Sequence, residues 1–153
     1  MKGVNVQKLE KQVAQAMEKY PAIISAYLFG SVVVGFDRQG SDIDIAVRID
    51  DRLAPETMFD LRLQLTVELE KLLEHAVDVI VLNTASLKMI HQVMTSGRKV
   101  YTIDANAETE FRLQKQKEYF DFLYYIEDDR MELNSFFGAS QLQGTSKDGK
   151  AGS

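Results

Sequence analysis

Two aspartates separated by a single residue, Asp42 and Asp44, are the side chains of this sequence best suited to chemistry. They open an alternating stretch, 42–49, that predicts a strand with both carboxylates on one face. Neighbouring carboxylates suit hard divalent cations, which take oxygen ligands. Asp78 lies in another short apolar stretch, and a carboxylate from a neighbouring strand would complete a site for two metal ions. In such a site one ion activates the attacking oxygen and the other stabilises the leaving group.

The Gly30-Ser31 pair, at the end of an apolar stretch, is the second chemical feature. Glycine lets the backbone approach a phosphate closely, and the N–H groups and the serine hydroxyl can donate hydrogen bonds to its oxygens. Taken singly, such a pair, an Asp-x-Asp or a lone aspartate is usually a turn, a strand edge or a cap. Ten residues separate Gly-Ser from Asp-x-Asp here, and the combination indicates a site for phosphate and metal.

Helices and strands must alternate along the chain to position these residues. The apolar spacing and the Pro and Gly breaks predict helices over 5–19, 55–72, 87–96 and about 105–134, and strands over 23–29, 42–49, 77–82 and 99–103. This order is typical of an α/β (α+β) domain, in which helices pack on a small mixed sheet.

The composition excludes several classes of function. The absence of cysteine excludes disulfides, zinc–cysteine sites and thiol nucleophiles. A net charge of −5 over 153 residues argues against direct nucleic-acid binding, which needs a surplus of Lys and Arg. Because no apolar run approaches a membrane span and no signal core follows Met1, we expect a cytoplasmic protein without membrane contact.

The charge and the glycines divide the chain into three parts. We expect a core over 1–104, a helical extension over 105–137 with four basic and eight acidic side chains, and a glycine-rich flexible tail over 138–153. Five aromatic side chains fall within seven positions of the extension and so surround much of the helix: Tyr119, Phe120, Phe122, Tyr124 and Tyr125. Either a groove of the chain's own domain or a basic partner protein would cover them.

The glycine-serine pair, the ten-residue spacing and the Asp-x-Asp motif together resemble the signature of the polymerase-β-like nucleotidyltransferase superfamily. The short chain, the run 41–47 and the later stretch 78–80 are similar to the minimal nucleotidyltransferases (MNT). More narrowly, they resemble the MntA-type antitoxins encoded beside HEPN-domain toxins. The resemblance covers residues 20–104, and it implies the polymerase-β-like nucleotidyltransferase fold with a long C-terminal helix.

The resemblance also implies a nucleotide-binding set. Gly30 and Ser31 would hold the β- and γ-phosphates. Arg38 stands where many members have a basic residue that meets a phosphate, and Ser41, next to the Asp-x-Asp motif, completes the set. Val34 is apolar where members often carry a basic or polar residue, which bears on nucleotide affinity but not on the metal ligands.

The catalytic residues implied by the resemblance are the three aspartates. Asp42 and Asp44 would ligate two Mg²⁺ ions, and Asp78 would share a metal and draw the proton from the acceptor hydroxyl. Clustered carboxylates repel one another, so without cations at least one should have an abnormally high pKa. Metal and nucleotide should therefore bind cooperatively.

The function implied by this resemblance is an antitoxin that transfers AMP from ATP to a tyrosine hydroxyl of a HEPN RNase toxin, within a hetero-oligomer of the two proteins. The charge of the extension suits such a basic partner. One alternative is a non-catalytic antitoxin that neutralises the toxin by binding through its C-terminal helix, which the apolar Val34 keeps open. A second alternative is a small-molecule nucleotidyltransferase of the aminoglycoside type, although about thirty residues beyond the core leave little for an acceptor domain.

Overall fold

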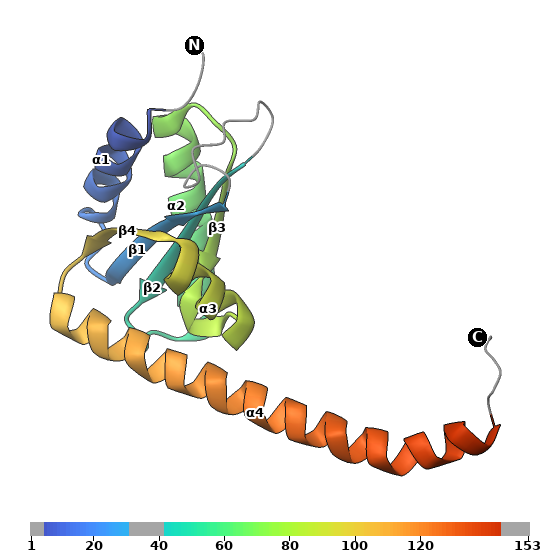
Figure 1. Ribbon diagram of the computed structural model, residues 1–153. Helices are drawn as coiled ribbons and strands as arrows, with labels where there is room; N and C mark the ends of the chain where they lie inside the picture. Colours follow the sequence, from blue (N-terminus) through green and yellow to red (C-terminus); the bar gives the residue numbers. More distant parts are fainter. Residues whose placement is uncertain (1–4, 31–41, 145–153) are drawn as a thin grey trace. The chain divides into compact units, whose positions relative to one another are not determined.

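Four strands form one mixed sheet in the order β3-β2-β1-β4 (Figure 1). This computed structural model describes residues 5–30 and 42–144. The central strands are β1 (Ile23–Phe29) and β2 (Ile43–Ile49), and the edge strands are β3 (Val77–Val81) and β4 (Arg98–Thr102). β2 and β3 run parallel, whereas β1 is antiparallel to both β2 and β4. The predicted small mixed sheet is confirmed.

Helices cover both faces of this sheet (Figure 1). α1 (Val6–Met17) and α2 (Pro55–Leu73) pack on one face, where they share the larger apolar cluster with the strands. α3 (Leu87–Ser96) and the first turns of α4 (Ala105–Gly144) contribute to a smaller cluster on the other face. The short 3-10 helix η2 (Leu82–Thr84) connects β3 toward α3. The sheet is therefore the middle layer of three.

The alternation along β2 decides which face carries the chemistry. Ile43 and Ile45 belong to the cluster under α1 and α2, and Ala46 belongs to the cluster on the opposite face. Because successive side chains alternate between faces, Asp44 and Arg48 lie on the same face as Ala46. The predicted alternation is confirmed.

Local signals set the helix starts. The Asn5 side chain accepts a hydrogen bond from the Lys8 N–H at 3.1 Å at the start of α1, and the Ser86 hydroxyl accepts one from the Met89 N–H at 3.1 Å at the start of α3. These caps satisfy N–H groups that have no partner within the helix. Pro55 begins α2, where its missing N–H costs little.

The last helix is longer than the sequence predicts. α4 continues to Gly144 instead of ending near residue 134. No proline interrupts it, and an internal glycine costs only about 1 kcal/mol. The helix therefore includes residues 138–144, which we expected in a flexible tail, while 145–153 lie outside the described residues.

The chain divides into two compact units between Lys115 and Gln116, beyond the expected boundary at 104. The first turns of α4 belong to the first unit because Glu108 is buried there and Phe111 packs on the smaller apolar cluster. The second unit, where it is described, is a single helix. Within 5–30 and 42–144, no helix combines the length and the apolar character that crossing a membrane requires.

Candidate active site

Strand pairing brings two of the predicted carboxylates together. Asp44 on β2 and Asp78 on β3 are register partners in the parallel ladder. Asp42 immediately precedes β2 and is exposed, as is Asp78, whereas Asp44 is half-buried. Paired positions on neighbouring strands place side chains on the same face about 5 Å apart. The pairing predicted for the third carboxylate is therefore present in the sheet.

Gly30 contacts the Asp44 carboxylate from the side of β2 opposite Asp78. It directly follows β1, whose last residue, Phe29, is the register partner of Asp44. Its φ of +84° lies in the left-handed region that favours glycine. A Cβ added at Gly30 would stand 3.2 Å from the Asp44 Cγ and would collide with the Oδ2 atom. The backbone conformation favours glycine here, and any larger residue would also have to push the Asp44 carboxylate aside.

The environment of Asp44 favours its neutral form. Partial burial raises the pKa of this carboxyl, and the charges of Asp78 and Asp42 raise it further. Each of these causes penalises a negative charge at Asp44 in the absence of cations. The expectation that one carboxylate of the cluster has a raised pKa is confirmed.

These carboxylates have the donor chemistry for a hard divalent cation such as Mg²⁺. Asp44 and Asp78 are paired, and Asp42 is close enough to influence the pKa of Asp44. Among residues 5–30 and 42–144, however, no three carboxylate or imidazole side chains converge closely enough to hold a metal ion as they stand. The neighbouring carboxylates raise the pKa of Asp44, and a cation at this position would neutralise that repulsion, so the donor chemistry fits a divalent ion.

Three predicted nucleotide-binding residues, Ser31, Arg38 and Ser41, lie outside the described residues, as does Val34. Their predicted roles stay predictions.

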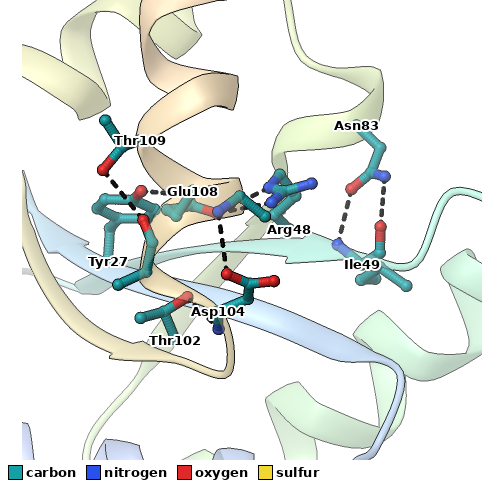
Figure 2. Close-up of polar contacts among 10 residues, drawn as sticks. Tyr27, Arg48, Ile49, Asn83, Thr102, Asp104, Glu108 and Thr109 are labelled. Carbon is teal, nitrogen blue, oxygen red and sulfur yellow. Dashed lines mark hydrogen bonds and ion pairs between the residues drawn. The ribbon is translucent and has the colours of Figure 1, made fainter.

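A buried charged cluster that sequence reasoning missed lies on the carboxylate face of the sheet (Figure 2). Glu108, on α4 within the first unit, is 1% exposed and accepts hydrogen bonds from the Tyr27 hydroxyl on β1 and from Arg48 Nε on β2 at 2.9 Å. Arg48 Nη2 lies 2.8 Å from the same carboxylate, and its guanidinium stands over the Phe111 ring at 4.4 Å. The cluster ties the start of α4 to two central strands.

The cluster also explains the state of Tyr27. Burial raises the pKa of this tyrosine, and its hydrogen bond to the Glu108 carboxylate raises the pKa further. The hydroxyl therefore stays protonated and donates to the carboxylate. The alternation along β2 predicts that Arg48 lies on the same face as Asp44, so its position could be inferred from the sequence. Nothing in the local sequence indicates that Glu108 is buried.

Asn83 holds the far end of β2. Its side-chain oxygen accepts from the Ile49 N–H at 2.9 Å, and its side-chain nitrogen donates to the Ile49 carbonyl at 2.6 Å (Figure 2). An amide side chain thus takes the place of a neighbouring strand where β3 has ended. The Glu108 cluster contacts β2 at Arg48, and Asn83 contacts it at Ile49. Both contacts fix the strand at its end away from Asp44.

Most of the aromatic side chains described in the second unit are exposed. Tyr124 and Tyr125 are 70% and 65% exposed, Phe120 and Phe122 are also exposed, and Tyr119 is half-buried. The helix has no second element within its own unit against which to bury them, and acids such as Asp121 and Glu127 lie among them. This unit therefore has the composition of a surface that a partner covers.

Comparison with known proteins agrees with the site. The family "Polymerase beta, Nucleotidyltransferase" matches residues 11–106, which include all three predicted metal ligands. The chain is also 34% identical over 102 residues to the protein adenylyltransferase MntA of Shewanella oneidensis, a stretch that covers 66% of this chain and 68% of that protein.

Solved structures show the same fold. A toxin–antitoxin structure with AMP-PNP contains a chain with a TM-score of 0.66 and 28% identity, covering 80% of this chain and 98% of its own length. A structure of the tri-AMPylated Shewanella oneidensis HEPN toxin in complex with an MNT antitoxin contains a chain with a TM-score of 0.62 and 27% identity, covering 82% and 98%.

Proposed function

Because this chain belongs to the polymerase beta nucleotidyltransferase family, we propose that it is an antitoxin that adenylylates a HEPN-domain toxin. AMP would pass from ATP to a tyrosine hydroxyl of the toxin and neutralise it. The observation that carries the proposal is the Asp44–Asp78 pair beside Gly30, within a region similar to the adenylyltransferase MntA. The MNT antitoxin structure with a tri-AMPylated HEPN toxin supports this choice of acceptor.

The reaction exchanges one bond to phosphorus for another. The tyrosine oxygen bonds to the α-phosphorus of ATP while the bond from that phosphorus to the oxygen bridging to the β-phosphate breaks, and pyrophosphate leaves. Asp78 accepts the hydroxyl proton. Two Mg²⁺ ions held by Asp42, Asp44 and Asp78 would activate the attacking oxygen and neutralise the leaving group.

The two substrates are proposed to lie on different sides of Asp44, which the strand order supports because β1 and β3 flank β2. Gly30, at the end of β1, brings its backbone against the Asp44 carboxylate, and its N–H group together with Ser31, Arg38 and Ser41 is proposed to donate to the phosphate oxygens. β3 lies on the other side of β2, and Asp78 on this strand would face the acceptor. The attacking oxygen would then reach phosphorus from the side opposite the departing pyrophosphate oxygen, as in-line displacement requires.

The toxin would contact the aromatic side chains of the second unit, which include Tyr124 and Tyr125. The acids among them suit a basic, RNA-cleaving protein, and the aromatic residues provide the large apolar contacts that dominate interfaces. Binding by this unit would keep the acceptor at high local concentration near the carboxylates.

The test is the intact mass of the toxin encoded by the neighbouring gene after incubation with the protein, ATP and Mg²⁺. We expect added mass of one or more AMP units, and no addition when Mg²⁺ is chelated. The double variant Asp42→Asn with Asp44→Asn should slow the addition at least about a hundredfold, as expected when groups that stabilise transition-state charge are removed. The matched control is Asp60→Asn on α2, an exposed acid that should leave the rate unchanged.

An unmodified toxin, or modification that persists in the double variant, would contradict the catalytic proposal. If the double variant still neutralises the toxin in cells as fully as the wild-type chain does, the protein is instead a binding antitoxin. That outcome would give the exposed aromatic unit the main role.

A further inference from the structure

A pocket of about 500 Å³ lies at the outer edge of β3, between the first half of α2 and the start of α3. Its lining is mainly apolar and includes Met58 and Phe59 from α2, Ile80 from β3 and Met89 from α3. Every lining residue belongs to the first unit. Two methionines give it adaptable walls, because the thioether side chain is flexible and polarisable.

This pocket is close to the third carboxylate. Ile80 follows Asp78 by two residues on the same strand, so the two side chains share one face of the sheet. Two residues of strand advance about 6.6 Å. The pocket therefore begins about that far from Asp78, on the side of β3 that faces away from Gly30.

Arg62 supplies a fixed cation at the pocket. Its Nε donates to the Val79 carbonyl at 2.7 Å, and its guanidinium lies 6.0 Å from the centre of the Phe59 ring. Within the part of the chain that the structure describes, no acidic side chain pairs with Arg62. A ligand with a carboxylate next to an apolar group would complement both features.

Side chains of α2 already occupy the outer edge of β3. Arg62 donates a hydrogen bond to the Val79 carbonyl, and the Glu70 carboxylate accepts one from the Val77 N–H at 3.1 Å. Added strands bind through such edge groups, so pairing of another chain with this edge is disfavoured. Recognition at this position must therefore use the side chains of the pocket.

We propose that this pocket binds the segment of the protein substrate that carries the acceptor tyrosine, which rests on the proposed function. An extended segment passing over Asp78 places its tyrosine hydroxyl at the carboxylate and the side chain two residues away in the pocket, because side chains repeat every second residue. The expected occupant is an apolar or aromatic side chain followed by an acid that reaches Arg62. The pocket would thus select which tyrosine is modified.

Photo-crosslinking tests the placement directly. p-Benzoylphenylalanine is introduced in place of Phe59, and in a matched variant in place of Leu63, one turn further along α2. The two positions are 55% and 46% exposed, and only position 59 lines the pocket. Full-length toxin is added and irradiated with a non-hydrolysable ATP analogue and Mg²⁺. Crosslinks from position 59 should map to the toxin peptide that carries the modified tyrosine, and position 63 should give at most a tenth of that yield.

Kinetics provide a second measurement. Phe59→Glu should raise the KM for toxin at least tenfold and change kcat less than twofold, because the pocket binds the acceptor and does not touch the reacting atoms. Leu63→Glu, the same change of charge on the same helix, should alter either constant less than twofold. Circular dichroism checks that both variants fold.

The outcomes separate the two proposals. If the wild-type chain leaves the toxin unmodified, the proposed function fails and the pocket assignment fails with it. If the wild-type chain modifies the toxin but position 59 crosslinks elsewhere or nowhere, or Phe59→Glu keeps the wild-type KM, only the pocket assignment is overturned. Equal effects at positions 59 and 63 would also overturn it, since they would indicate a broad contact along α2.

Discussion

The two units of this chain use apolar side chains in opposite ways. Up to Lys115, residues such as Leu65 and Ile45 are fully buried between sheet and helices. Beyond Gln116, side chains as large as Tyr124 and Phe136 are exposed on a single helix. Residue type is therefore a poor guide to burial on its own. Whether an aromatic side chain belongs to a core or to an interface depends on whether a second element covers it.

Removing the second unit should have the largest effect on function, the loss of toxin neutralisation. A chain that ends at Lys115 keeps both apolar clusters, whose members lie at or before Phe111. We expect its melting temperature to stay within about 5 °C of the full chain, a change of about 1 kcal/mol. We also expect it to lose neutralisation of the toxin. Thermal unfolding by circular dichroism and rescue of toxin-expressing cells measure the two results. A truncated chain that does not fold would show that the two units are not independent.

The buried cluster of the first unit should give the largest change in stability for a single substitution. Glu108→Ala leaves Arg48 partly buried without its carboxylate and the Tyr27 hydroxyl without its acceptor. We expect a loss of about 3–5 kcal/mol in the free energy of unfolding, measured in urea. Glu110→Ala, an exposed change two residues further along the same helix, should cost less than about 0.5 kcal/mol. Similar losses in both variants would mean that the cluster adds nothing specific.

Substitutions of the exposed aromatic side chains of the second unit should lower the affinity for the toxin and leave the stability of the fold unchanged. Replacing Tyr124 and Tyr125 together by Ser removes exposed rings, so the free energy of unfolding should change by less than about 0.5 kcal/mol. The affinity for the toxin, measured by calorimetry, should fall by about 2 kcal/mol or more, the scale of an interface hot spot. Leu65→Ala in the core is the converse control and should cost about 2–5 kcal/mol of stability. An unchanged affinity in the double variant would place the partner elsewhere.

The smallest effect concerns a surface ion pair of the first unit. The Glu68 carboxylate lies 2.7 Å from Lys19 Nζ and accepts from the Tyr20 hydroxyl at 2.5 Å. These contacts, first that with Lys19, lower the pKa of Glu68. A lowered pKa stabilises the fold above the unfolded-state value, and the contribution is lost as the pH falls through the folded-state value. Glu68→Gln should cost about 0.2–1 kcal/mol at pH 7 and progressively less as the pH falls through the folded-state pKa, as urea unfolding over a series of pH values would reveal.

Much of the fold is predictable because its signals are local. Among the described residues, every strand and α-helix starts within a few residues of its prediction, since alternation, caps and Pro55 act over one turn or one strand, whereas the short helix η2 was not predicted. The end of α4 is the exception, because no stop signal stands between 134 and Gly144. The three carboxylates were found from residue type and spacing, and the pairing of Asp44 with Asp78 followed from adjacent strands.

Long-range contacts were not predictable in the same way. From the sequence, Glu108 is expected to be exposed like the other acids of its helix. Its burial depends on where α4 begins relative to Tyr27 and Arg48. The pocket at Arg62 likewise exists only because α2 and α3 flank the outer edge of β3, where no further strand pairs.

The sequence by itself determined which residues can do chemistry and which face of a strand they share, because the two-residue period of a strand leaves no choice. The tertiary structure alone decided the strand order, which puts Gly30 and Asp78 on opposite sides of Asp44, and the close contact between Gly30 and the Asp44 carboxylate. It also decided which apolar and charged side chains find a second element to cover them. Contacts of this kind join residues far apart in the chain, and their geometry depends on packing rather than on local backbone preference.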